Sequence, residues 1–268
     1  MHEPLKVTFD KNVYEFIVDP EKDAPVSSEE RDVFRAINKL INDRKILPFI
    51  SETIITYEAV AKKERFNILT YDSPIVVKAE GSLISLSSNP EIYPGNHLKD
   101  DVYLTKAIGA GFKILPGKRF GKLINPGIKN EWYYFIDEDY FTTAKRFEDV
   151  VKEIEIMGAG YSHFLTLITT KENKHLPRNE KLKFYKGSVK KLSAAVAEWS
   201  DGDSIALHIA YGVDYFCTYD EGKNAGRNST FGQMVYGQLN RKFGVKKVMP
   251  RELLAYANFV EDVFPKNP

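Results

Sequence analysis

The chain is poor in cysteine, in long apolar runs and in net charge, and each shortage excludes a class of protein. Cys217 is the only cysteine among the 268 residues. One thiol cannot build an internal disulfide framework or a zinc site made of cysteines. The sequence has no apolar run of membrane-spanning length and no basic-then-apolar leader at its start. We therefore expect a cytoplasmic protein that does not enter a membrane.

The charge balance excludes a protein that attracts nucleic acid through its overall charge. Lysine and arginine together number 38 and aspartate and glutamate 37, so that the formal net charge is +1. Any affinity for a phosphate backbone must therefore come from a local group of basic residues. The clearest basic stretch spans residues 171–191, where Lys183 and Lys186 flank the aromatic pair Phe184 and Tyr185. Such a stretch either binds an RNA backbone and stacks its bases or is simply a solvated loop.

The hydrophobic pattern predicts an α/β fold with a mainly parallel sheet, because short apolar segments alternate with amphipathic helices. Strands are expected at residues 5–9, 46–50, 161–169, 214–218 and 245–249. Helices are expected at residues 27–44, 51–63, 139–156, 189–199, 201–211 and 230–242, with another beginning at Pro250. We expect a single domain whose core comes from residues 1–65 and 137–268.

Residues 66–136 differ in character and are expected to be an inserted, β-rich segment of undetermined topology. The segment begins with a predicted β-hairpin, in which residues 75–79 and 82–86 are joined by Glu80-Gly81. A stretch rich in proline and glycine follows, and then a short helix near residues 102–108.

Acidic residues follow two of the predicted strands, and others lie on helices. Asp10 comes directly after the first strand, Asp220 comes shortly after the strand at 214–218, and Glu58 lies in the middle of a helix. Taken singly, each is an ordinary surface acid. Because the carboxyl ends of parallel strands meet at one edge of a sheet, we expect these acids to converge there. Clustered carboxylates repel one another, and their oxygens are the ligands that Mg²⁺ and Mn²⁺ prefer.

A further acid comes from the predicted helix that ends at Gly212. Asp201 and Asp203 both lie near its start, and Asp203 stands beside Ser204 in the expected first turn. The pattern leaves both residues open as the additional ligand, with Asp203 preferred.

Together these features resemble the PIN domain family. Asp10-x-Asn12 matches the family's opening Asp-x-Asn/Ser, Glu58 its glutamate in the middle of a helix, and Thr218-x-Asp220 its closing Thr/Ser-x-Asp. The resemblance covers the two ends of the chain, in the family's order. It implies a three-layer α/β/α sandwich and a metal-dependent ribonuclease that cleaves single-stranded or structured RNA with an activated water.

The resemblance also implies roles for single residues. One or two Mg²⁺ or Mn²⁺ ions would be held by the catalytic acids Asp10, Glu58, Asp203 and Asp220. The family's spacing to the glycine that ends the helix selects Asp201 in place of Asp203, and both are retained. The substrate-binding residues would be Lys11, Asn12, Thr218, Lys183 and Lys186. Asn12 and Thr218 are equally suited to hydrogen bonds with the local backbone.

Two other functions fit the same residues. A chain that keeps the fold without turnover would bind RNA or a protein through residues 66–136 and the basic stretch. Alternatively, the chain is the toxin of a toxin–antitoxin pair with an antitoxin-like protein partner, although such toxins are usually more compact. RNA is the expected partner in the leading interpretation, and a second copy of the chain is a further candidate.

Overall fold

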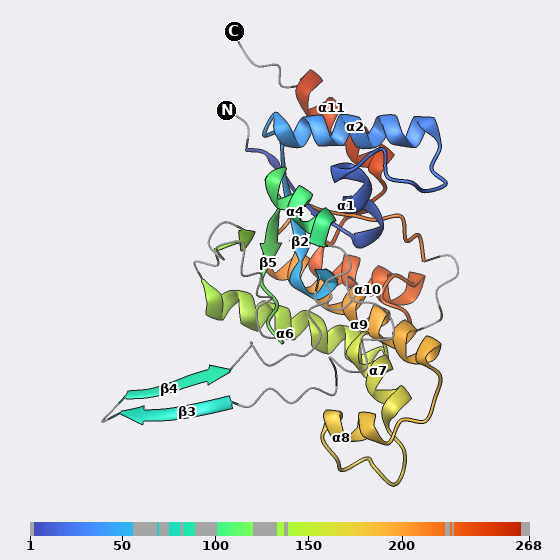
Figure 1. The fold of residues 1–268 in the computed structure, drawn as a ribbon. Coiled ribbons are helices and arrows are strands. Elements are labelled where there is room, and N and C mark those ends of the chain that lie inside the picture. The colour runs from blue at the N-terminus through green and yellow to red at the C-terminus, as the bar shows by residue number, and fades with distance from the viewer. Residues whose placement is uncertain are drawn as a thin grey trace.

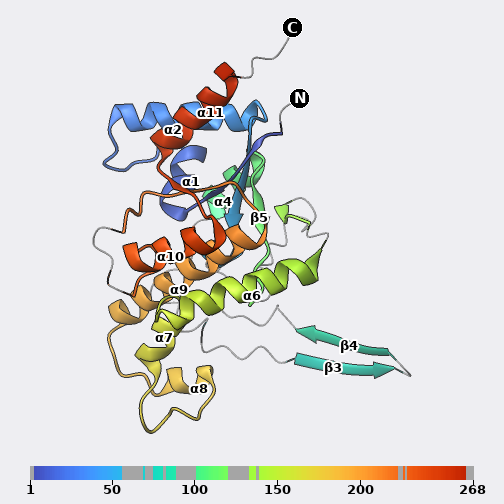
Figure 2. The same cartoon turned by 180° about the vertical axis from the view of Figure 1, so that it is seen from behind.

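The computed structural model describes residues 3–55, 69, 75–80, 83–88, 101–119, 133–136, 139–222, 226 and 228–263. Within these residues the chain forms an α/β fold around a five-stranded sheet in which neighbouring strands all pair in parallel. The predicted α/β class and its parallel sheet are thus confirmed. Figures 1 and 2 show helices on both sides of this sheet.

The order of the strands defines a switch point in the sheet. The strands are β1 (Leu5–Phe9), β2 (Ile46–Ser51), β5 (Lys113–Leu115), β6 (Tyr215–Cys217) and β7 (Lys247–Val248). Their order is β5-β2-β1-β6-β7, with β1 at the centre. The chain adds β2 and β5 on one side of β1, and later adds β6 and β7 on the other. The direction of winding therefore reverses between β1 and β6.

One face of the sheet packs against a core built with two helices that follow β1, one helix that precedes β5 and one helix that follows β7. These helices are α1 (Lys11–Val18), α2 (Ser28–Asn42), α4 (Asp101–Gly109) and α11 (Pro250–Val263). Strands β1 and β2 contribute Val7, Phe9, Ile46 and Ile50 to this core. These residues alternate along their strands, as expected when every second side chain points to the same face.

The opposite face of the sheet packs against helices from the second half of the chain. These are α6 (Tyr140–Ile156), α9 (Val189–Ala210) and α10 (Gln233–Phe243). Phe49 of β2 and Phe216 of β6 belong to this second core. Two polar contacts also tie α9 to the sheet: Ser204 Oγ donates to Ser51 Oγ at 2.9 Å, and His208 Nδ1 lies 3.0 Å from Thr8 Oγ1.

A third, smaller core lies at the amino-terminal end of α9. It joins α7 (Tyr161–Ile168) and α8 (Arg178–Lys183) to α9 through Phe164, Leu182 and Trp199. In Figures 1 and 2, α8 lies on the far side of α9 from the sheet. The basic stretch at 171–191 therefore belongs to the lobe built around this third core.

Several local signals in the sequence form the expected structure. The capping box predicted by Ser27 and Glu30 opens α2, where the Glu30 N–H donates to Ser27 Oγ at 3.2 Å and the Ser27 N–H donates to the Glu30 carboxylate at 3.3 Å. Gly212 follows the end of α9 with φ of +63°, a conformation that glycine adopts without strain. The predicted hairpin is present as β3 (Ile75–Glu80) and β4 (Leu83–Ser88), which pair antiparallel.

The predicted break between a helix at 189–199 and another at 201–211 is wrong, because α9 runs through it without interruption. The expected cap residues Asp201, Asp203 and Ser204 therefore lie in the interior of a 22-residue helix. A Cβ at Gly202 would lie only 3.0 Å from the Cα of Gly160. This glycine permits a close approach between chain segments and does not mark the start of a helix.

The predicted strand at 161–169 is also wrong, because this segment forms helix α7. Tyr161, Phe164 and Ile168 recur at helical spacing, and Tyr161 and Phe164 pack on Trp199 with ring centroids 4.5 and 5.0 Å away. The run of β-branched residues at its end favoured a strand, but packing against α9 decides the structure.

The expected core boundaries need correction, because part of the segment 66–136 belongs to the main sheet. Strand β5 pairs with β2, with Phe49 opposite Lys113 and Ile50 opposite Ile114. Helix α4 contributes Leu104 to the core under the same sheet. A three-residue strand between glycines shows too few residues for its period to be recognised from sequence. Among the described residues, no helix is long and apolar enough to cross a membrane.

Candidate functional site

The candidate site lies at the carboxyl ends of β1 and β6, on either side of the switch point. The two strands pair from Val7 opposite Tyr215 to Phe9 opposite Cys217. The N–H of Asp10 continues this ladder by donating to the Cys217 carbonyl oxygen at 3.0 Å. The residues that follow each strand therefore arrive at the same place, which is where open α/β sheets bind ligands.

Asp10 occupies this position with a buried carboxylate. The residue caps the start of α1 and is only 6% exposed. Its Oδ1 accepts from the Lys11 N–H at 2.6 Å, and its Oδ2 accepts from Thr218 Oγ1 at 2.6 Å. Burial raises the pKa of Asp10, and the negative charge of Asp220 adds to the rise, whereas the bonds from Thr218 and Lys11 oppose it.

Asn12 and Thr218 connect the two strand ends. Asn12 Nδ2 donates to Thr218 Oγ1 at 3.3 Å, and Asn12 Oδ1 accepts from the Tyr219 N–H at 3.2 Å. Thr218 Oγ1 in turn accepts from the Asp220 N–H at 3.0 Å. Both side chains satisfy local groups, and in doing so they set the relative position of the two acids.

Asp220 is only partly exposed, and its own carboxylate shapes the turn that follows. Its Oδ1 accepts from the Gly222 N–H at 2.8 Å, which closes a local turn two residues long. This bond holds the side chain of Asp220 in a defined orientation beside Asp10.

Asp203 lies in a different environment, on α9, and is 3% exposed. Its Oδ2 accepts from Trp199 Nε1 at 3.1 Å, and its Oδ1 lies 3.6 Å from Nη1 of Arg119. Arg119 also pairs with Glu155 at 2.5 Å. Burial raises the pKa of Asp203 to about 7, although Arg119 and Trp199 oppose the rise. Asp203, the residue preferred from the sequence as the additional metal ligand, therefore already interacts with an arginine and an indole.

Asp201 faces another side of α9. Residues two apart on an α-helix are rotated by about 200°, so Asp201 and Asp203 cannot point at the same ligand. Asp201 is a surface neighbour of Glu198, three residues earlier. Glu198 Oε1 accepts from the N–H and the hydroxyl of Thr230, both at 2.7 Å. The side of α9 that carries Glu198 therefore faces the segment that follows Asp220.

Among the remaining predicted site residues, the described contacts bring only the backbone N–H of Lys11 to Asp10. Glu58 lies outside the described residues. The ammonium of Lys11 lies 3.8 Å from Oε1 of Glu15 on its own helix. Lys183 and Lys186 are exposed at and just beyond the end of α8, in the lobe on the far side of α9.

Three charged residues near the strand ends were missed from the sequence: Glu52, Arg119 and Lys247. Glu52 directly follows β2 and is 1% exposed, with Oε1 accepting from the Tyr134 hydroxyl and Oε2 from the Gly117 N–H, both at 2.5 Å. Its place after a predicted strand is the same signal that identified Asp10. No pattern marks Arg119 or Lys247, because their partners are distant in sequence.

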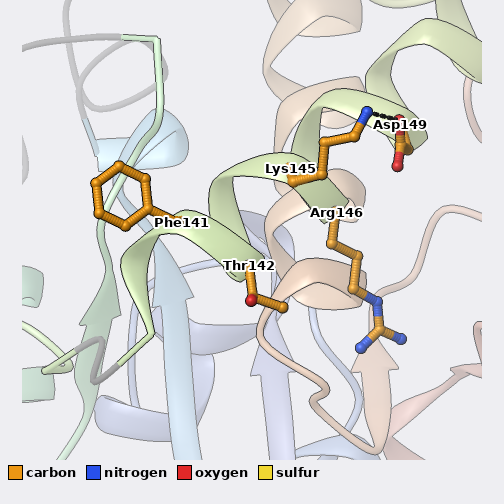
Figure 3. Close-up of a pocket in the computed structure, with 5 residues that line it drawn as sticks. All are labelled: Phe141, Thr142, Lys145, Arg146 and Asp149. Carbon is orange, nitrogen blue, oxygen red and sulfur yellow. Dashed lines mark hydrogen bonds and ion pairs between the residues drawn. The ribbon is translucent and has the colours of Figure 1, made fainter.

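A surface hollow of about 410 Å³ lies away from these residues, on the outer side of α6. It is lined by Phe141, Thr142, Lys145, Arg146 and Asp149. Figure 3 shows that all five side chains come from this one helix, and Lys145 Nζ pairs with Asp149 at 2.8 Å. Among the described residues the lining comes from α6 alone, so the hollow offers less for binding than the strand ends do.

The donor set at the strand ends fits a hard divalent cation. Asp10 and Asp220 offer carboxylate oxygens. The charge of Asp220 raises the pKa of Asp10, and a bound cation would offset that repulsion. No three metal-ligating side chains converge among the described residues, which leave out Glu58. The pair is therefore part of a possible ligand set, to which further oxygen donors must be added.

Comparison of the chain with models of protein families, with curated proteins and with solved structures gives no match. The case for a function therefore comes from the geometry of the site.

Proposed function

We propose that the protein is a metal-dependent nuclease that hydrolyses phosphodiester bonds in RNA, with a PIN-like three-layer α/β/α arrangement. The observation that carries the proposal is that Asp10 and Asp220 meet at the switch point of a parallel sheet, where the Thr218 hydroxyl bonds the carboxylate of Asp10 and the N–H of Asp220. The helices on both faces of the sheet support the three-layer arrangement. The oxygen donors and their unbalanced charge favour Mg²⁺ or Mn²⁺.

The chain's own residues prepare the site in three ways. Thr218 and the Lys11 N–H hold both oxygens of Asp10, so that its carboxylate has one orientation. Asn12 bridges the two strand ends, and Asp220 is held by its turn. When bound between such carboxylates, Mg²⁺ or Mn²⁺ lowers the pKa of a water molecule and neutralises charge on the phosphodiester.

We assign the third acid to Asp201 and no longer to Asp203. Trp199 and Arg119 engage Asp203, whereas Glu198, three residues before Asp201 on α9, contacts Thr230 in the segment after Asp220. Glu58 remains the proposed fourth acid. The exposed Lys183 and Lys186 would bind the RNA backbone.

The test is cleavage of a fluorescently labelled single-stranded RNA with Mg²⁺ or Mn²⁺. The wild-type protein should cleave it, and Asp10→Asn and Asp220→Asn should each lose roughly 100-fold or more in rate, since each removes a charge required in the transition state. Asp201→Asn should lose activity to a similar degree.

The matched control is Asp214→Asn. Asp214 precedes β6 and accepts from the Lys6 N–H at 2.8 Å, so it marks the opposite end of the strand that leads to Asp220. Its variant should retain the wild-type rate. Equal activity of Asp10→Asn and wild type would refute the proposal. Metal-independent RNA binding without cleavage would instead indicate a binding module. A loss in Asp203→Asn but not in Asp201→Asn would reverse the assignment of the third acid.

A further inference from the structure

Lys247 places an ammonium group beside the candidate metal site. It lies on β7, the neighbour of β6, and its Nζ donates to the backbone carbonyl oxygen of Asp220 at 2.7 Å. The same ammonium lies 5.3 Å from the ring centroid of Phe231 and 4.9 Å from that of Tyr236. The side chain is thus held between two aromatic rings and aimed at the residue that supplies the second carboxylate.

The contact acts on the part of the chain that orients Asp220. The N–H of Asp220 donates to Thr218 Oγ1, and its carboxylate accepts from the Gly222 N–H. The Lys247 ammonium adds a bond to the carbonyl oxygen of the same residue. The amide, carbonyl and side chain of Asp220 are therefore each fixed by a different partner.

We propose that Lys247 is a positioning residue of the acid pair, which holds the backbone of Asp220 so that its carboxylate faces Asp10. This inference rests on the proposed function, because it assumes that the pair binds a divalent cation. Groups that orient metal ligands from behind affect affinity without touching the metal.

The direction in which a Lys247 substitution changes cation affinity distinguishes a positioning role from a purely electrostatic one. Removing a positive charge near a cation site strengthens cation binding, because the repulsion between the two charges is lost. Releasing the backbone of Asp220 weakens binding, because the carboxylate is no longer held in place. Lys247→Met removes both the charge and the hydrogen bond, so the direction of its effect decides between the two roles.

The experiment is titration of the full-length protein with Mn²⁺, with free Mn²⁺ followed by its electron paramagnetic resonance signal. Lys247→Met should weaken Mn²⁺ binding by about tenfold, and Lys247→Arg, which keeps a charged donor, should recover most of the affinity. Unchanged or tighter binding in Lys247→Met would overturn the inference.

Two control variants account for charge and for packing. Lys246→Met removes the same charge from the adjacent residue, whose ammonium lies over Tyr215. Tyr236→Phe removes the hydroxyl that accepts from the Lys247 N–H at 2.7 Å and donates to the Val245 carbonyl, so it weakens the packing around β7 without removing the ammonium. Both should bind Mn²⁺ as the wild type does. A tenfold loss in either one would assign the effect to charge or packing and overturn the inference.

Hydrogen exchange without metal gives a reading that does not depend on the proposed function. In Lys247→Met the amides of Asp220 and Gly222 should exchange about tenfold faster, because their turn has lost its anchor. The amides of Phe216 and Thr218, which pair β6 with β7, should be unchanged. If the wild type binds no Mn²⁺ but these two amides still respond, the proposed function fails and the positioning of Asp220 stands. Equal exchange in both proteins would refute that positioning.

Discussion

Asp203 and Asp10 are buried carboxylates in two regions of this molecule, and the two regions balance their charge differently. Asp203 lies beside the guanidinium of Arg119 and accepts from an indole N–H. Asp10 accepts hydrogen bonds from neutral donors, and its charged neighbour is another acid, Asp220. A buried acid with its own arginine is satisfied within the fold. At the acid pair the ammonium of Lys247 bonds the backbone carbonyl oxygen of Asp220 and not a carboxylate, so the two carboxylates keep a charge that an external cation would balance.

The largest effect should come from removing the cation of the Asp203 region. Arg119→Met keeps much of the side-chain volume but leaves Asp203 and Glu155 without their shared guanidinium. We expect the free energy of unfolding to fall by about 3 kcal/mol, because removing one partner leaves an uncompensated buried charge. Urea unfolding measures this loss. Lys118→Met removes the adjacent charge, which lies over the rings of Tyr140 and Tyr211, and serves as the control. An equal loss in both variants would contradict the comparison.

A pH-dependent effect of similar size should come from Asp203 itself. Its pKa is raised from 3.8 to about 7, so the unfolded chain releases the proton at lower pH than the folded protein does. The contribution of Asp203 is therefore fully present below about pH 4 and is lost as the pH rises through about 7. Relative to Asp203→Asn, the wild type should lose about 3 kcal/mol of stability over this range. Urea unfolding at several pH values measures the difference, and a difference that does not vary with pH would show that Asp203 is ionised throughout.

A smaller loss should come from the neutral donors around Asp10. Thr218→Val removes the hydroxyl that donates to Asp10 Oδ2 and leaves that buried carboxylate with fewer partners. We expect the free energy of unfolding at neutral pH to fall by about 1–2 kcal/mol, as for other hydrogen bonds to charged groups. Thr166→Val, in which an exposed helical hydroxyl is lost, should change little and is the matched control. Equal unfolding midpoints for Thr218→Val and wild type would show that the hydroxyl does not support Asp10.

The smallest effect should have the opposite sign. Asp220→Asn removes one of the two repelling charges and keeps an acceptor for the Gly222 N–H. Without metal, we expect stability to rise by less than about 1 kcal/mol, because Asp220 is partly exposed and its repulsion of Asp10 is screened. Added Mn²⁺ should raise the thermal midpoint of the wild type but not of the variant. A variant less stable than the wild type would indicate that the acids are not in conflict.

Local chemistry explains which parts of the fold and the site could be predicted from the sequence. Asp10 and Asp220 follow short apolar strands, and such acids reach the carboxyl edge of a parallel sheet whatever the rest of the chain does. The capping box at Ser27 and the glycine after α9 are likewise decided by a few neighbouring residues.

Other parts depend on partners that are distant in sequence. Asp201, Asp203 and Ser204 indicate a helix start in the sequence, but α9 continues through them, with Gly202 packed against Gly160. Asp203 looks like a ligand until Arg119, from the loop after β5, is seen beside it. Lys247 carries no local signal, because its contact with Asp220 spans 27 residues. In each case the burial and charge of the residue depend on the packing of separate segments.

The amino-acid sequence by itself determined the parallel α/β class and the delivery of Asp10 and Asp220 to strand ends, because strand period and chain direction are local properties. Only the tertiary structure decided that α9 is continuous, that β5 joins the main sheet and that Asp203 is paired with Arg119. These outcomes depend on which segments pack against each other and exclude water. The free energy of burial is gained only when two segments meet, so neither segment's sequence determines it alone.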